Sequence, residues 1–333
     1  MALLATSRID GAGLLTALMV LAGLGNALVQ PAAGRYIATE IPRGRLSLAT
    51  GLVGAALGAA PFVPGLLVAL VAAPRGWRAA LTVGGIVALA SLLLAPLARA
   101  RGRRAAARPS SAATAVAPGR TDSQAGRSRI ATLWCWTLAA LLGTVGVNVA
   151  ATYFVQIGTH SGLSIAVAGA LLSAASVIAV VMRIVVGALA DRAPKRNPAM
   201  VALMMLSGAV GLGVMTLATP LSFVLGAVLA VAGGWGWTGL LLAASMRLLP
   251  DDAPRAGAAM QIGLFSGAAI APLAFGTLVA AIGVPATVGI AAIASLGGAA
   301  TVLAGVTILR RPAWQAGQPA TTEPDRDLTE VSR

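Results

Sequence analysis

Long apolar runs, separated by short polar or basic loops, dominate the hydrophobic pattern of the chain. Each run reaches the roughly 20 residues that a helix needs to cross the hydrocarbon core of a bilayer. The runs cover residues 11–34, 46–72, 79–98, 130–156, 163–186, 198–219, 221–246, 256–282 and 285–309. The pattern therefore predicts an all-α fold, a polytopic membrane helix bundle with nine transmembrane helices.

The composition indicates that lipid is the solvent for most of the chain. Of the 333 residues, 58% are hydrophobic and 10% are charged, whereas about a quarter of the residues are charged in an ordinary soluble domain. We therefore expect a multi-pass protein of the cell membrane, with the lipid bilayer as its partner. The single Cys135 and the single His160 exclude a disulfide framework and a multi-histidine metal centre, so no metal or cofactor is expected.

Basic residues are distributed unevenly among the loops, and this sets the predicted orientation. The loops after the first, third, fifth, seventh and ninth runs hold most of the arginines, whereas residues 157–162, 219–221 and 283–285 contain no Lys or Arg. By the positive-inside rule the basic loops and the C-terminus lie in the cytoplasm, and the N-terminus lies outside. Because the net charge of +14 resides mainly in these loops and in the linker, attraction to anionic lipid and control of topology explain it. No nucleic-acid partner is expected.

The runs group into two unequal lobes. The predicted domains are a partial N-terminal lobe of three helices (1–98), a cytoplasmic linker (99–129), a C-terminal six-helix lobe (130–311) and a disordered cytoplasmic tail (312–333). The linker is rich in Arg, Ala, Ser, Pro and Gly and has no apolar period, which is typical of a flexible segment.

An internal repeat relates the two lobes. The shift that carries Pro42-Arg43 onto Pro254-Arg255 also carries Gly51-Leu52 onto Gly263-Leu264. It pairs the first three runs with the last three, and parallel repeats of this kind occur in secondary transporters. The fourth to sixth runs have no counterpart, which predicts a twelve-helix protein that lacks its first three helices. The alternative is a genuine nine-helix protein.

The segment 187–196, GALADRAPKR, places an acid and several cations in one turn between two runs. Here the chain resembles the major facilitator superfamily (MFS) of transporters, over residues 8–311. The family signature G-x-L-A-D-R-x-G-R/K-R/K is carried by Gly187, Leu189, Ala190, Asp191, Arg192, Lys195 and Arg196. Arg183 also fits the family pattern, as does Gly-Trp-Arg at 76–78, whereas Pro194 stands where the family usually has Gly.

The resemblance implies a role for this turn in gating. An Asp just past a helix end can accept hydrogen bonds from the exposed N–H groups of a neighbouring helix N-terminus. By the symmetry of the repeat, that neighbour is the second run near residues 44–48, with Arg43 and Arg45 at hand. We therefore expect a cytoplasmic gating loop that latches the lobes together, formed by Arg183, Gly187, Asp191, Arg192, Lys195 and Arg196. The alternative is that these charges only set topology.

Polar residues within the runs are candidates for a solute cavity. The fourth run carries a stripe at steps of four residues, the spacing of one helix face. The cavity candidates are Asn148, Thr152, Tyr153 and Gln156 on this run, Asn26 and Gln30 on the first, Trp235 and Thr238 on the seventh, and Gln261 on the eighth. Hydrogen bonding between helices uses the same residue types, so it stays open as the alternative. For Trp235, packing is favoured.

Together these features favour a monomeric secondary active transporter, not an enzyme, that moves a small organic solute by alternating access between two lobes. A proton is the candidate coupling ion, although no run carries a carboxylate near its middle. Charged solutes are disfavoured because the runs show no charge at depth. The alternatives are a truncated, non-transporting remnant of such a carrier and an integral-membrane enzyme, whose clustered His, Asp, Glu or Cys the sequence does not supply.

Overall fold

The computed structural model describes residues 2–6, 11, 13–24, 41, 45–90 and 124–310. Within these ranges every regular element is a helix, which confirms the all-α fold. The elements are α1 (Ala2–Thr6), α3 (Leu46–Ala59), α4 (Phe62–Leu67), η2 (Val68–Ala72), α5 (Ala73–Arg75), α6 (Trp77–Ala90), α8 (Gln124–Thr152), α9 (Phe154–His160), α10 (Ile165–Arg192), η4 (Pro194–Arg196), α11 (Asn197–Met215), α12 (Pro220–Gly234), α13 (Trp237–Leu248) and α14 (Ala253–Arg310). A further helix covers Gly13–Leu24.

Five helical segments in the described ranges are long and apolar enough to cross a membrane, all of them after residue 124. They correspond to the predicted runs from the fourth onward, and the last two runs are the halves of α14. These halves meet at Gly283, whose φ of 80° and ψ of 170° interrupt the helix in the predicted loop 283–285. A positive φ is accessible to glycine because it has no Cβ. The multi-pass membrane fold is thus confirmed.

The count of nine spans stays a prediction. In the first part of the chain the described apolar helices are shorter, and they include Gly13–Leu24, Phe62–Arg75 and Trp77–Ala90. Residues 25–34 and 91–98, which complete the first and third predicted runs, lie outside the described residues. Most of the predicted linker and the predicted tail also lie outside them, but helix α8 already begins at Gln124, within the expected linker.

Three predicted runs are interrupted where the sequence pattern predicts a continuous helix. The second run breaks near Pro61, between α3 and α4, and the fourth breaks at Tyr153, between α8 and α9. The seventh breaks at Trp235 and Gly236, between α12 and α13. Hydropathy does not signal these breaks because the interrupting residues are themselves apolar or flanked by apolar residues.

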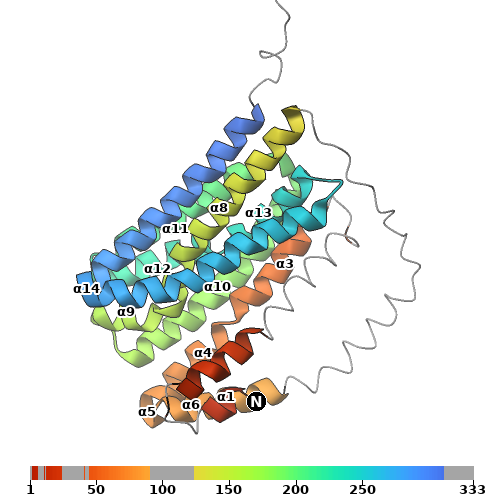
Figure 1. Cartoon of the computed structure of the whole chain (residues 1–333). Helices are drawn as coiled ribbons and strands as arrows, with labels where there is room; N and C mark the ends of the chain where they lie inside the picture. The colour runs from red at the N-terminus through yellow and green to blue at the C-terminus, as the bar shows by residue number, and fades with distance from the viewer. Residues whose placement is uncertain are drawn as a thin grey trace, which may run out of the picture.

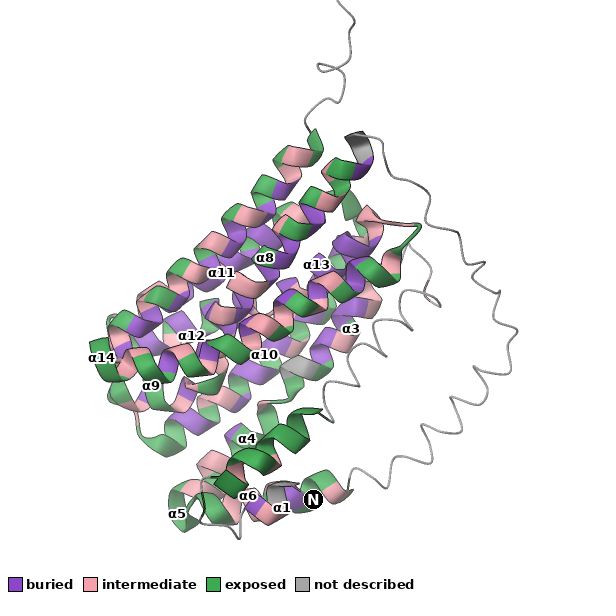
Figure 2. Ribbon diagram, in the orientation of Figure 1, coloured by how far each residue is buried: buried purple, intermediate pink, exposed green. Residues whose placement is uncertain are grey.

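Helices α8 and α10–α14 form the main bundle (Figure 1). Helix α3 runs beside α10 and α13, and α4 and η2 continue along α10, so the first part of the chain packs on the bundle mainly through α10. Buried residues concentrate between α8, α11 and α13 (Figure 2). Large apolar side chains on the outside stay exposed, among them Leu273 (75%) and Leu221 (69%). Such a surface fits lipid rather than water.

Candidate functional site

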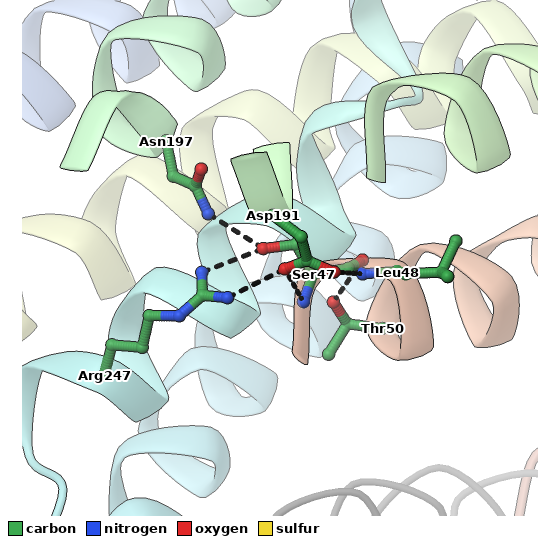
Figure 3. A network of polar contacts seen from close by, with 6 residues as sticks. All are labelled: Ser47, Leu48, Thr50, Asp191, Asn197 and Arg247. Atoms are coloured by element: carbon green, nitrogen blue, oxygen red, sulfur yellow. Dashed lines mark hydrogen bonds and ion pairs between the residues drawn. The ribbon is translucent and has the colours of Figure 1, made fainter. Parts of the chain in front are cut away.

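The carboxylate of Asp191 caps the N-terminus of α3. Asp191 lies in the last turn of α10, and its side chain points at the first turn of α3 (Figure 3). The backbone N–H of Ser47 donates to its Oδ1 at 2.9 Å, and that of Leu48 donates to its Oδ2 at 2.8 Å. N–H groups in a first helical turn lack partners within their own helix, and the helix dipole favours an anion there. Two segments 143 residues apart in sequence are joined in this way.

Arg247, in the last turn of α13, completes the neutralisation of this carboxylate. Its Nη2 donates to Asp191 Oδ1 at 2.9 Å, and its Nη1 donates to Ser47 Oγ at 2.8 Å. The side chains of Arg247 and Asp191 are 19% and 13% exposed. Hydrogen bonds between charged groups are stronger than neutral ones, and partial burial protects them from solvent screening.

Asn197, at the start of α11, is fully buried beside this pair. Its side-chain amide lies 3.0 Å from Ser47 Oγ. The amide satisfies all its neighbours when its nitrogen donates to the carbonyl oxygen of Ala190 (3.1 Å) and its oxygen accepts from Arg247 Nη1 (2.8 Å). Four helices therefore meet at one polar cluster. We call it the Asp191 network, and its members are Ser47, Leu48, Asp191, Asn197 and Arg247.

The other residues of the expected gating loop divide into two groups. Arg192, Lys195 and Arg196 are exposed at the turn, where Pro194 begins a short 3-10 helix. Gly187 is buried, and a Cβ there would lie 2.9 Å from the carbonyl oxygen of Ser47 on α3. The three cations are therefore exposed, whereas the glycine allows α3 to approach α10 closely.

Arg183 does not lie in the loop. Because α10 continues unbroken to Arg192, Arg183 is two turns inside the helix and is 3% exposed. Its Nε donates to the carbonyl oxygen of Trp235 at 2.8 Å, and its guanidinium carbon lies 4.9 Å from the centre of the Trp235 ring. Arg183 is therefore a charge buried within the protein, inside the fifth predicted run.

The cation partner of Asp191 differs from the one expected. Arg43 lies outside the described residues and Arg45 is exposed, whereas Arg247 occupies the site. The repeat singled out Arg247 as one of a pair of equivalent arginines, since the shift that pairs Pro42 with Pro254 also pairs Arg35 with Arg247. Ser47 and Asn197 carried no such signal, because an isolated hydroxyl or amide at a helix start is common.

A small cavity of about 20 Å³ lies between Pro61 of the first part and helices α8, α9, α10 and α12. Its wall is largely apolar and includes Phe154, Leu172, Ser176 and Trp235. Of the predicted cavity residues that the structure describes, Trp235 lines this cavity. Small-molecule sites are commonly concave and mostly apolar, with few polar groups.

The remaining cavity candidates do not converge on this pocket. Asn148 donates to Thr144 O within its own helix at 3.2 Å. Thr152 and Gln156 are exposed, and Gln261 is partly exposed. Asn26 and Gln30 lie outside the described residues.

Tyr153 holds the α8–α9 break against α14. Its hydroxyl donates to Pro272 O at 2.9 Å, and its ring stacks on Phe275 with centroids 4.1 Å apart. We predict that Tyr153→Phe removes the hydrogen bond, keeps the stacking and lowers the unfolding free energy by about 1 kcal/mol. A lower melting temperature of the purified protein, with solute transport retained, is the expected result. Loss of transport with an unchanged melting temperature would instead place the hydroxyl in the solute path.

The fold defines a multi-pass helical membrane protein, and comparison with known families is consistent with this. Residues 1–238 match the family described as Major Facilitator Superfamily. Because the match covers more than half of the chain, the protein belongs to the Major Facilitator Superfamily, a family of membrane transporters. A comparison with curated proteins finds no match.

Proposed function

We propose that the protein is a secondary transporter that moves a small organic solute by alternating access, and that the Asp191 network closes its cytoplasmic end. The two moving bodies are the segment 1–98 and the segment 130–311. The observation that carries the proposal is that Asp191, on the second segment, caps a helix of the first. Exposed cations at the same turn, Arg192 and Lys195 among them, support its cytoplasmic location.

The strength of the network suits a contact that forms and breaks. Asp191 accepts three hydrogen bonds, from two backbone N–H groups and from Arg247. Hydrogen bonds to charged groups contribute roughly 1.5–3 kcal/mol each when well buried, and partial exposure lowers this. A bias of a few kcal/mol selects one conformation but leaves the other populated. Differential solute binding can then shift the equilibrium.

Accessibility of a cysteine in the cavity tests alternating access without knowledge of the solute. Ser176 lines the cavity and is 3% exposed, and Ser176→Cys is a small change. In a Cys135→Ser background we expect a membrane-impermeant maleimide to modify this cysteine from either side of sealed vesicles of known orientation. The cysteine should be modified from both sides because the proposed movement of the lobes exposes the cavity to each side in turn.

A matched pair of variants sharpens this test. Asp191→Ala is expected to raise the rate of modification from the cytoplasmic side at least tenfold. Asp252→Asn serves as the control. Asp252 is 53% exposed, and its ion pair with Arg255 is long (3.8 Å) and lies at the surface, so it contributes little. Modification from one side alone, unchanged by Asp191→Ala, contradicts alternating access.

A further inference from the structure

Arg183 is a buried charge with unused hydrogen-bonding capacity. It lies about 12 Å along α10 from Asp191, at 1.5 Å per residue, in a helix long enough to cross the membrane. Its Nη1 is buried and has no hydrogen-bond partner among the described residues. Within those residues no carboxylate forms an ion pair with it. Ionisable groups at such depth are costly and mark solute or ion paths more often than not.

A second unpaired polar atom lies close by. The Oγ1 of Thr238, on α13, is buried and also lacks a partner in the described part of the chain. A Cβ at Gly54 on α3 would lie 3.5 Å from Arg183 Cδ and 3.9 Å from Thr238 Oγ1. The side chains of Arg183 and Thr238 therefore both lie beside Gly54, where α3 presents no side chain, between the two proposed lobes.

Trp235 connects this point to the cavity. It interrupts the helix between α12 and α13, lines the cavity, and holds Arg183 through its carbonyl oxygen and its ring. Ala179, one turn before Arg183 on α10, also lines the cavity. The arginine thus lies just beyond the cavity wall on the side of the Asp191 network. Interrupted membrane helices commonly line solute sites.

We propose that Arg183 and Thr238 bind the anionic group of the transported solute, and that the apolar cavity wall holds its hydrocarbon part. The solute class is a small organic monoanion, such as a monocarboxylate. A guanidinium matches a carboxylate with two parallel hydrogen bonds, and a single unpaired cation balances a single negative charge. This inference rests on the proposed transport function and names its substrate class.

Matched probes test this proposal in the purified full-length protein. Acetate, lactate, hexanoate and benzoate are compared with their uncharged amides by thermal unfolding in detergent. A ligand that binds the folded state raises the melting temperature with its concentration. At least one carboxylate is expected to do so, whereas its amide has no effect. Arg183→Gln should abolish the shift, and Arg183→Lys should weaken apparent binding at least tenfold.

Two further variants keep the test decisive if Arg183→Gln does not fold. Thr238→Val is nearly isosteric and is expected to weaken carboxylate binding several-fold, and Asp252→Asn is expected to leave it unchanged. The proposal is overturned if all four carboxylates act like their amides, or if Arg183→Lys and Thr238→Val bind them as the wild type does.

Labelling of the cysteine at position 176 distinguishes failure of the carboxylate-binding proposal from failure of the transport proposal. If the cysteine is labelled from both sides but no carboxylate binds, the proposed substrate class is overturned and the transport proposal remains. Carboxylate binding with one-sided labelling supports the site but overturns alternating access.

Discussion

Asp191→Ala is expected to release the first turn of α3 and open the cytoplasmic end of the protein. The substitution removes the acceptor for the N–H groups of Ser47 and Leu48 and the carboxylate that Arg247 contacts. For a partly exposed network we expect a loss of about 2 kcal/mol, roughly a 30-fold shift toward the open state. Backbone hydrogen exchange of residues 45–56, followed by mass spectrometry, should accelerate by a similar factor.

Two comparisons isolate the role of the charge in this result. Asp191→Asn keeps an acceptor oxygen but loses the negative charge, so it should accelerate exchange less than alanine does. Asp252→Asn removes an exposed carboxylate at the same end of the bundle and should have no effect. Exchange at residues 45–56 that is the same in Asp191→Ala and in the wild type would show that Asp191 does not hold α3.

A bulky residue at Gly51 is expected to force α3 away from α10. A Cβ there would lie 2.8 Å from the carbonyl oxygen of Arg183 and 3.4 Å from the Cα of Gly187. Both neighbours are backbone atoms of a helix, so they cannot move aside as a flexible side chain can. Overpacking of this kind costs typically about 1–3 kcal/mol. Gly51→Val should therefore disfavour the closed arrangement by roughly tenfold or more.

The rate of cytoplasmic modification of a cysteine at position 176 measures this effect. It should rise in Gly51→Val and stay at the wild-type value in Gly213→Val. Gly213, on α11, is the matched control because a Cβ there meets no atom within 4 Å. An unchanged rate in a folded Gly51→Val protein would mean that close approach of α3 and α10 does not maintain the closed state.

Much of the fold could be predicted from the sequence, because lipid imposes long apolar runs on any helix that crosses it. The break at Gly283 fell within a predicted loop for this reason. The interruption at Trp235 and Gly236 could not be predicted in the same way. Both residues are compatible with an apolar run. The hydrogen bond to the carbonyl oxygen of Trp235 comes from Arg183, on a helix distant in sequence.

The candidate site was predictable only in part. The loop signature and the repeat together pointed from Asp191 to the start of α3, because a carboxylate at a helix end seeks unpaired N–H groups. They did not identify Arg247, whose approach depends on how α13 packs. They also placed Arg183 in the cytoplasmic gating loop, because it lies near the end of the predicted run 163–186. The burial of Arg183 follows from the packing of Trp235 and of α3 against α10, which hydropathy alone does not reveal.

The distance between the two segments at their cytoplasmic end tests the central proposal most directly. Arg45 precedes α3 and Lys195 follows α10, and both side chains are exposed. Spin labels at these positions, in a Cys135→Ser background, report the separation by pulsed electron spin resonance. The wild type should show a predominant short distance, and Asp191→Ala should transfer most of the population to a longer one. Identical distance distributions in the two proteins would contradict the proposal that Asp191 holds two moving lobes together.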